Sequence, residues 1–203
     1  ATVTINMSLY PKLGYDTIRD LTGVSIVSST PMVLVIAPTL PVKNVKELIA
    51  LATRRPGELN FSSAGSGTVS HLAGKVFKTV TKTKMTHIPY KGNAGALTSL
   101  IGGEVQLGFP NIAAVIQHIH SGRRRALAIT SARKAETLPG VPTLKELGVN
   151  VDLDIWYGVL VPAATPRDVI EKLADAVRKS VHAPDVHQRL KDQGADPIGG
   201  TPD

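Results

Sequence analysis

The chain has 203 residues, 42% of them hydrophobic, and its 23 basic residues outnumber 16 acidic ones to give a formal net charge of +7. A chain of this length and composition can bury a core as one large domain or two small ones, without a metal or a disulfide. It contains no cysteine, which excludes disulfides, cysteine nucleophiles and thiolate metal sites.

The positive charge favours small anions over nucleic acid as ligands. Nucleic-acid-binding proteins usually concentrate basic residues in a stripe and expose aromatic rings for stacking. Here aromatic residues make up 4% of the chain, and the single dense basic run covers residues 123–125. The longest apolar stretch, residues 32–37, has strand length and falls far short of the roughly 20 residues that span a bilayer.

The two ends have the pattern of a chain cut from a longer one. Residues 1–6 (ATVTIN) provide neither an initiator Met nor the basic start of a signal peptide. At the other end, Thr201 and Pro202 are typical of the cap and the first residue of a further helix. We therefore expect a signal peptide to be absent from this sequence, and its absence does not fix the compartment.

Strands and helices are expected to alternate along the chain. Strands are predicted over residues 24–27, 32–36, 59–62, 86–88, 105–109, 126–129 and 155–161. The sequence SSTP, residues 28–31, is expected to separate the first two strands. The alternation predicts an α/β architecture with mostly parallel strands, and the nearly continuous Val, Leu and Ile runs indicate strands covered on both faces.

Caps mark most of the helix starts. Asn44 and Thr143 each open a capping-box pattern, Asn111 can cap a helix that runs through residue 119, and Thr165 precedes Pro166 at the start of a long helix. Further helices are expected from residue 69, over 94–101 and over 184–193, and the Thr143 helix ends at Gly148.

The apolar spacing also predicts which helix faces are buried. In the helix from residue 69 these are Val69, Leu72, Val76 and Val80. In the helix from residue 166 they are Val169, Leu173, Ala176, Val177 and Ser180.

The most informative stretch is residues 62–71 (SSAGSGTVSH), which lies between a predicted strand and a helix start. Unpaired N–H groups and the helix dipole make such a turn suitable for an anion, and glycines let the backbone approach it. An ordinary glycine turn with a serine cap fits equally well. The spacing does not match a phosphate-binding P-loop or the G-x-S-x-G turn of hydrolases.

Two further segments could face the same site. Residues 89–93 (PYKGN) form a turn before a helix, and a plain surface turn is an equal alternative. Asn111 is interpreted first as a helix cap and second as a ligand contact. The six histidines are spaced too irregularly to predict a metal site, and His71 is expected to pack or cap.

Nothing in the sequence supplies a nucleophile with a base and an orienting third group. Ser66 or Ser70 with His71 is the one serine–histidine pair that an esterase-like enzyme could use. Asp152 and Asp154 are expected on a solvated strand face.

The order of segments resembles the Bug-type, TctC-like periplasmic solute-binding receptors of tripartite tricarboxylate transporters. The resemblance is carried by residues 9–13 (LYPKL), 30–36 (TPMVLVI), 41–49 (PVKNVKELI), 65–68 (GSGT), 71–74 (HLAG), 87–92 (HIPYKG), 100–105 (LIGGEV), 126–131 (ALAITS), 139–143 (PGVPT), 156–158 (WYG), 162–163 (PA) and 165–166 (TP). The segments follow one another in the family's order along essentially the whole chain.

The resemblance implies an α/β, type II periplasmic-binding-protein fold, with two lobes around a cleft and crossover strands between them. Residues 1–33 and 157–203 would form the first lobe and residues 34–156 the second. Family members begin with a strand, a Pro-Ala-Gly-Gly loop and a long helix that precede the first residue of this chain. The first lobe is therefore expected to be incomplete and the second whole.

The resemblance also implies a non-enzymatic function, the capture of a small carboxylate (an amino acid, a di- or a tricarboxylate) for membrane transporter subunits. It implies a monomer in the periplasm that needs no cofactor, no metal and no nucleic acid. The residues that would form the site are Ser66, Gly67 and Thr68 on a carboxylate, Tyr90, Lys91 and Gly92 along the cleft, and Asn111 closing it.

Two other functions remain open from the sequence. An effector-sensing domain of a cytoplasmic transcription regulator can share this fold, and it would carry a helix-turn-helix in its full gene. An α/β hydrolase is the second alternative, and it would depend on the serine–histidine pair at His71.

Overall fold

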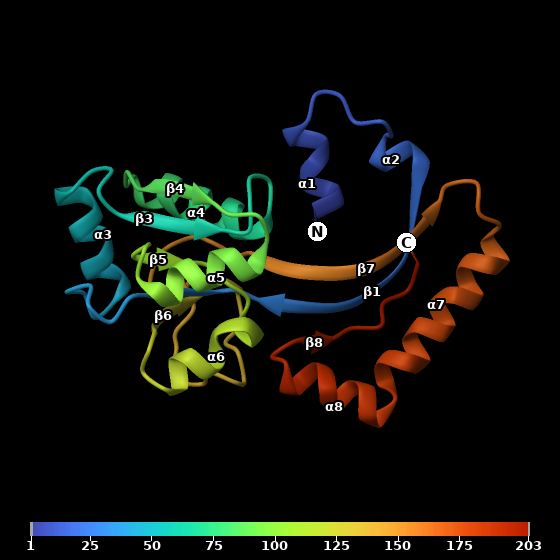
Figure 1. The fold of residues 1–203 in the computed structure, drawn as a ribbon. Helices are drawn as coiled ribbons and strands as arrows, with labels where there is room; N and C mark the ends of the chain where they lie inside the picture. Colours follow the sequence, from blue (N-terminus) through green and yellow to red (C-terminus); the bar gives the residue numbers. More distant parts are fainter. Residues whose placement is uncertain (1, 203) are drawn as a thin grey trace. The chain divides into compact units, whose positions relative to one another are not determined.

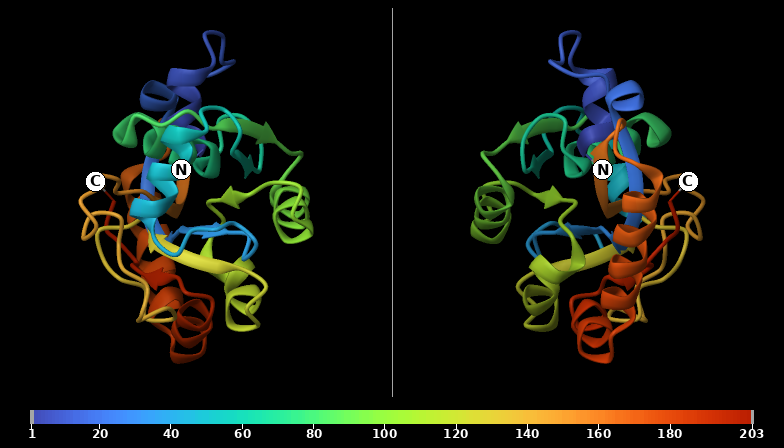
Figure 2. Two further views of the ribbon diagram at one scale, coloured as in Figure 1. Left: turned by 90° about the vertical axis from the view of Figure 1, so that its left-hand side faces the viewer. Right: turned by 90° about the vertical axis from the view of Figure 1, so that its right-hand side faces the viewer.

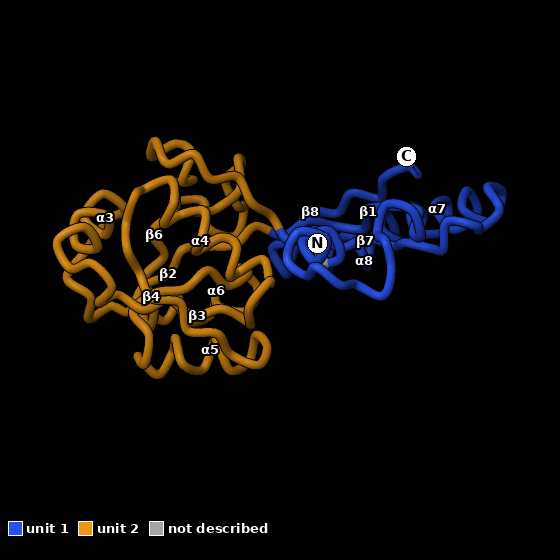
Figure 3. The backbone as a smooth tube through the Cα atoms, turned by 90° about the horizontal axis from the view of Figure 1, so that it is seen from above, with its two compact units in different colours: residues 1–30, 155–203 blue, residues 31–154 orange. Residues whose placement is uncertain are grey.

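A computed structural model describes residues 2–202, which form two compact units (Figure 3). Unit 1 comprises Ala1–Thr30 and Ile155–Asp203, and unit 2 comprises Pro31–Asp154. The chain therefore enters unit 2 once and leaves it once. Among the described residues, no helix combines the length and the apolar character needed to cross a membrane.

Unit 1 is a three-stranded sheet with four helices (Figure 1). Its elements are α1 (Thr2–Leu9), α2 (Thr17–Asp20), β1 (Leu21–Pro31), β7 (Asp154–Pro162), α7 (Arg167–His182), α8 (Pro184–Asp192) and β8 (Asp196–Pro197). The strand order is β7-β1-β8, and β8 pairs antiparallel with β1. Val24 of β1 packs with Ile170 and Ala174 of α7 to form the core of the unit.

Unit 2 contains a five-stranded sheet in the order β4-β3-β5-β2-β6. Its elements are β2 (Val33–Ile36), α3 (Val45–Arg54), β3 (Asn60–Ser63), α4 (Val69–Thr81), β4 (Thr86–Pro89), α5 (Asn93–Gly102), β5 (Leu107–Gly108), α6 (Ile112–His120) and β6 (Arg125–Ile129). Alternate residues of β2 face opposite sides of this sheet. Val33 and Val35 pack with residues of α5 and α6, which Figure 2 shows on the same side of the unit.

Four of the five strands of unit 2 run in one direction, as expected, and the expectation is wrong for β2 alone. Strand β3 is parallel to β4 and β5, whereas β2 is antiparallel to both β5 and β6. A helix between two strands gives a parallel pair, as in β3–α4–β4. Strand β2 follows β1 with Met32 alone between them, so it enters the sheet from the opposite end.

The expected break over residues 28–31 is also wrong, because β1 continues through these residues to Pro31. Ser28 and Ser29 are held in the sheet by their pairing with Pro197 and Asp196 of β8, which lie far away in the sequence. The pairing with a strand that is distant in the sequence therefore outweighs the local turn signals.

Thr130 ties together the two segments through which the chain enters and leaves unit 2. Its hydroxyl accepts a hydrogen bond from the Met32 N–H (3.1 Å) and donates to the Leu153 carbonyl (2.6 Å). Its backbone N–H donates to the Met32 carbonyl (2.9 Å), and its carbonyl accepts from the Leu153 N–H (3.0 Å). Thr130 is completely buried, so water does not compete for these bonds.

The capping hydrogen bonds predicted at Asn44, Asn111 and Thr143 are confirmed, whereas the helix predicted after Thr143 and the cap predicted at Thr165 are wrong. Asn44 caps α3 and Asn111 caps α6 through their side-chain oxygens. Thr143 and Glu146 exchange the two expected hydrogen bonds, but Gly148, at a φ of 78°, ends the segment after one turn and no helix forms. Thr165 does not cap α7, which begins after Pro166 without a side-chain cap.

The predicted buried faces of two helices are also displaced. In α4 the buried residues are Val69, Ala73, Gly74 and Phe77. In α7 they are Ile170, Ala174 and Val181. Both helices carry two adjacent apolar stripes, and tertiary contacts choose between them: Phe77 meets Phe109 in the core, and Ile170 meets Val24. The further helix expected from Thr201 lies beyond the described residues, which end at 202.

Gly74 is required by the close packing of α4 on β3, and this gives a test of the fold. A Cβ atom at position 74 would lie within 2.7 Å of three atoms of the buried Phe61 ring. We expect Gly74→Ala to lower the free energy of unfolding by about 1–3 kcal/mol, because the ring has no room to move. Urea unfolding measures this loss.

Gly102, at the end of α5, is the matched control, since a Cβ atom there meets nothing within 4 Å. Gly102→Ala should leave stability unchanged or raise it by up to about 1 kcal/mol. Equal midpoints for the two variants would contradict the packing of α4 on β3.

Candidate anion-binding cavity

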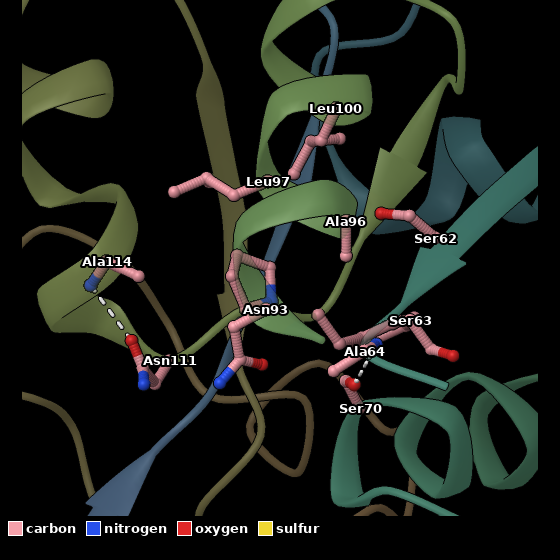
Figure 4. A pocket seen from close by; sticks show the side chains of 12 residues that line it. Ser62, Ser63, Ala64, Ser70, Asn93, Ala96, Leu97, Leu100, Asn111 and Ala114 are labelled. Atoms are coloured by element: carbon pink, nitrogen blue, oxygen red, sulfur yellow. Dashed lines mark hydrogen bonds between the residues drawn. The ribbon is translucent and has the colours of Figure 1, made fainter. Parts of the chain in front are cut away.

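Unit 2 contains a small hollow, of about 30 Å³, where two parallel strands end and three helices begin (Figure 4). The cavity is lined by the last residues of β3, by the segment that follows β5, and by residues of α4, α5 and α6. The lining residues are Ser62, Ser63, Ala64, Ser70, Asn93, Ala96, Leu97, Leu100, Phe109, Pro110, Asn111 and Ala114.

The three helix starts give the cavity its electrostatic character. Helices α4, α5 and α6 have 13, 10 and 9 residues, and the N–H groups of their first turns have no acceptor within the helix. The partial positive charge of a helix N-terminus adds to the attraction of these donors for an anion. None of the twelve lining residues has a charged side chain, so no carboxylate repels an anion at this position.

Two loops that follow β3 and β4 are joined by backbone hydrogen bonds at the edge of the cavity. The N–H of Tyr90 donates to the Ser63 carbonyl (3.0 Å), and the N–H of Gly92 donates to the Ala64 carbonyl (2.9 Å). The loops approach so closely that a Cβ atom on Gly65 would lie 3.2 Å from the Tyr90 carbonyl oxygen. Gly65 also has a φ of 130°, which few other residues adopt.

Asn111 has a side-chain orientation that its own helix fixes. Its Oδ1 accepts a hydrogen bond from the Ala114 N–H (2.9 Å), so Oδ1 and Nδ2 cannot exchange places without loss of the cap. Nδ2 therefore remains available as a donor. The backbone of Asn111 forms an isolated antiparallel bridge with Met32.

Two stacked histidines support the loop after β3. The ring of His87, on β4, lies 4.9 Å from the Phe61 ring and 4.0 Å from the His71 ring, measured between centroids. His71 Nδ1 accepts a hydrogen bond from the Gly67 N–H (3.1 Å), and His87 Nε2 lies 2.6 Å from the Ser63 hydroxyl. Both rings thus hold the glycine-rich loop through side-chain nitrogens.

Burial lowers the pKa of both rings. Desolvation is the main cause that lowers the pKa of His87 to about 4, and the nearby His71, Lys75 and Lys78 lower it further. The pKa of His71 is lowered by the same desolvation and by the two lysines. A neutral His71 can accept the Gly67 N–H, whereas an imidazolium cannot.

The sequence-predicted site residues lie in the same region, but only Asn111 lines the cavity. The Thr68 hydroxyl caps α4 and donates to the Gly65 carbonyl (2.7 Å), and the Gly67 N–H is bonded to His71. Ser66 and Lys91 are exposed.

The two remaining predicted residues take part in the loop pairing. Both Tyr90 and Gly92 use their N–H groups to join the loops. The Tyr90 hydroxyl, in addition, donates to Glu104 (3.2 Å).

Ser62 and Asn93 lie in the two stretches selected from the sequence, residues 62–71 and 89–93, but neither was named as a site residue, and Ala114 was not selected at all. The available clue was position: Asn93 directly follows the Gly92 turn, and Ala114 lies one turn inside a helix with an asparagine cap.

The serine–histidine contact in this region does not resemble a catalytic triad. The Ser70 hydroxyl accepts from the Ala64 N–H (3.1 Å) and contacts Thr68, and not His71. The pair that does meet is Ser63 and His87, but Ser63 is only 1% exposed, and the charged groups that influence His87 are all basic. A triad needs an accessible nucleophile and a carboxylate that orients the base.

The fold is of the α/β class and consists of two compact units. The sequence matches the family described as the tripartite tricarboxylate transporter family receptor over residues 1–202, and the chain belongs to this family. BugT of Bordetella pertussis (strain Tohama I) is 36% identical over 204 residues, which cover 100% of this chain and 63% of BugT. The family resemblance noted in the sequence is confirmed.

Two solved structures show the same fold. Rpa4515 of R. palustris, solved with adipate, is 34% identical with a TM-score of 0.86, and the match covers 95% of this chain and 64% of that protein. MatC of Rhodopseudomonas palustris, with bound malate, is 29% identical with a TM-score of 0.84, covering 94% and 65%. The expected periplasmic-binding fold is confirmed, and the chain spans less than two thirds of the length of these three proteins.

The histidine stack predicts a loss of stability in acid. Between pH 6.5 and about 4, unfolded His87 takes up a proton that the folded protein does not bind, so the unfolded state is favoured as the pH falls. His71 acts in the same direction. We expect the unfolding temperature of His87→Gln to fall less than that of the wild type over this interval, as followed by circular dichroism.

The exposed His120 provides the control, as His120→Gln removes a histidine on α6 without touching the stack. Its pH dependence should match that of the wild type. A His87→Gln curve parallel to the wild-type curve would show that the stack does not stay neutral in the folded protein.

Proposed function

We propose that the chain is the ligand-binding part of a solute receptor, and that it takes up a small carboxylate in the cavity of unit 2. The observation that carries the proposal is the meeting of three helix N-termini at one hollow whose lining has no charged side chain. Such a hollow favours a small anion and offers nothing specific to a cation.

A carboxylate has two oxygens that accept several hydrogen bonds, and the donors around the cavity suit this geometry. The first-turn N–H groups of α5 and the fixed Nδ2 of Asn111 supply donors at its edge. Adipate and malate, which accompany two related structures, are both carboxylates.

The proposal extends to the biological setting. As a member of a receptor family, the protein would act in the periplasm as a monomer and deliver its ligand to membrane transporter subunits. It would bind without catalysis, which agrees with the buried Ser63 and its lack of an orienting carboxylate. The two units would correspond to the two lobes of the receptor.

Ligand-induced stabilisation tests the proposal directly. A ligand at a hundred times its dissociation constant should stabilise the folded protein by about 2.7 kcal/mol. For a protein of this size that raises the unfolding temperature by roughly 5–11 °C. The measurement is thermal unfolding in the presence of mono-, di- and tricarboxylates, with chloride-matched controls. If none of these acids raises the unfolding temperature, the result argues against the proposal.

Asn111 gives a residue-level test. Serine caps a helix about as well as asparagine but lacks the Nδ2 donor, so Asn111→Ser should keep the stability and weaken carboxylate binding by about three- to tenfold. Asn44→Ser changes the cap of α3 in the same way outside the cavity. Calorimetric titration should show a loss of affinity for the first variant alone; equal affinities would remove Asn111 from the site.

A further inference from the structure

Unit 2 carries a groove of about 510 Å³ that is separate from the anion-binding cavity. It is lined by the start of α3, the end of α4 and the turn of residues 147–149. Helix α4 reaches both places: Ser70 lines the cavity near its start, and Val80 lines the groove roughly 15 Å further along the helix axis. The uptake of a carboxylate in the cavity therefore does not account for the groove.

The groove gathers the exposed apolar side chains of unit 2. Val45 and Val149 form a buried floor, at 2% and 6% exposed. Val80 and Leu147 are 40% and 44% exposed, and no other large apolar side chain described in unit 2 is exposed. Single exposed apolar residues are common on protein surfaces, but both of these line one hollow, which is typical of an interaction site.

The backbone holds the exposed side chains in place. The N–H groups of Leu147 and Val149 both donate to the Leu144 carbonyl, at 3.1 and 2.9 Å. Gly148, between them, has a φ of 78°, which permits this tight turn. Val80 lies in the last turn of the 13-residue helix α4. The groove is thus preformed, and a partner would not have to order it on binding.

Lysines surround the groove. Lys46 lines it, Lys82 directly follows Thr81 of the lining, and Lys145 lies two residues before Leu147. All three lysines are exposed, and their ammonium groups form no ion pair with any residue that the structure describes.

The carboxylates nearest in the sequence are engaged within their own segments. Glu47 accepts a hydrogen bond from the Lys43 N–H (2.7 Å). Glu146 accepts from the Thr143 N–H (3.0 Å) and forms an ion pair with Lys134 (3.5 Å). An apolar centre is therefore bordered by positive charge that these carboxylates do not neutralise.

We propose that this groove docks an acidic amphipathic helix of a protein partner, with apolar side chains seated between Val80 and Leu147 and carboxylates beside the surrounding lysines. An amphipathic helix carries an apolar row on one face with charges beside it, and it binds by laying that row into an apolar groove. The charge of the border selects an acidic partner over a basic one.

The concave shape distinguishes a protein partner from a membrane. A protein that binds a bilayer surface inserts protruding apolar side chains into the lipid. Here the apolar side chains line a hollow, which accepts the side chains of another molecule. The inference does not depend on carboxylate binding, because peptide binding and carboxylate binding are measured separately.

Two synthetic peptides of about 18 residues test the inference on the full-length protein. Both carry leucines at i, i+3, i+4 and i+7 spacing, and the remaining positions are rich in glutamate in one peptide and in lysine in the other. We expect the acidic peptide to bind at least about tenfold more tightly than the basic one, as measured by fluorescence anisotropy. Added salt should weaken its binding.

Val80→Glu should weaken the acidic peptide at least about tenfold, because it places a carboxylate among the seated apolar side chains. Val169→Glu is the matched control: Val169 lies on α7 of unit 1, is 39% exposed and does not line the groove. Its affinity for the peptide should equal that of the wild type. Equal losses in the two variants, or no binding of the acidic peptide to the wild type, would overturn the inference.

Two other occupants would be recognised by their own signals. If the wild type sediments with phosphatidylglycerol vesicles and Val80→Glu does not, the groove binds a membrane and the inference is wrong. If the wild type forms a dimer in analytical ultracentrifugation and Val80→Glu does not, the occupant is a second copy of the chain, and the inference is again wrong.

Discussion

The cavity depends on the hydrogen bonds that join the loops after β3 and β4. Two parallel strands normally separate where they end, but here Tyr90 and Gly92 continue the pairing with Ser63 and Ala64. This continuation fixes where α4 and α5 begin, and therefore where their unpaired N–H groups lie. The approach is possible only because Gly65 has no side chain.

The histidine stack reinforces this pairing without adding charge. Neutral His71 and His87 hold Gly67 and Ser63 while the ring of Phe61 shields them on the other side. Lysine or arginine could hold the same loop, but either would add a permanent charge to it. The histidine rings hold it by hydrogen bonds.

Local signals predicted the helix starts well, because a cap and a glycine turn act within a few residues. Asn44 and Asn111 cap as expected, and the GSGT turn does precede a helix. These local signals did not predict the direction in which each side chain points. Ser62 and Ser63 are identical neighbours that both line the cavity, and only the register of β3 against β4 and β5 brings Ser63 to His87.

The same limit explains the helix faces and the mixed sheet. When an α-helix has two adjacent apolar stripes, the stripe that finds a packing partner is the one that is buried, as where Ile170 packs against Val24. The direction of β2 follows from its continuity with β1, and β1 in turn is held past Ser28 by a strand near the other end of the chain. Pairing between strands that are distant in the sequence determines these features, so a short stretch of sequence does not predict them.

The bonds of Thr130 have a consequence for the ancestry of the fold. Met32 and Leu153 are the neighbours of the two points at which the chain crosses between units, and one buried threonine holds both. Unit 2 is thus one continuous segment of the chain, and hydrogen bonds join its two ends. This arrangement allows one domain to be inserted into another. A segment built in this way can be gained, lost or exchanged as a module, with its entry and exit already matched.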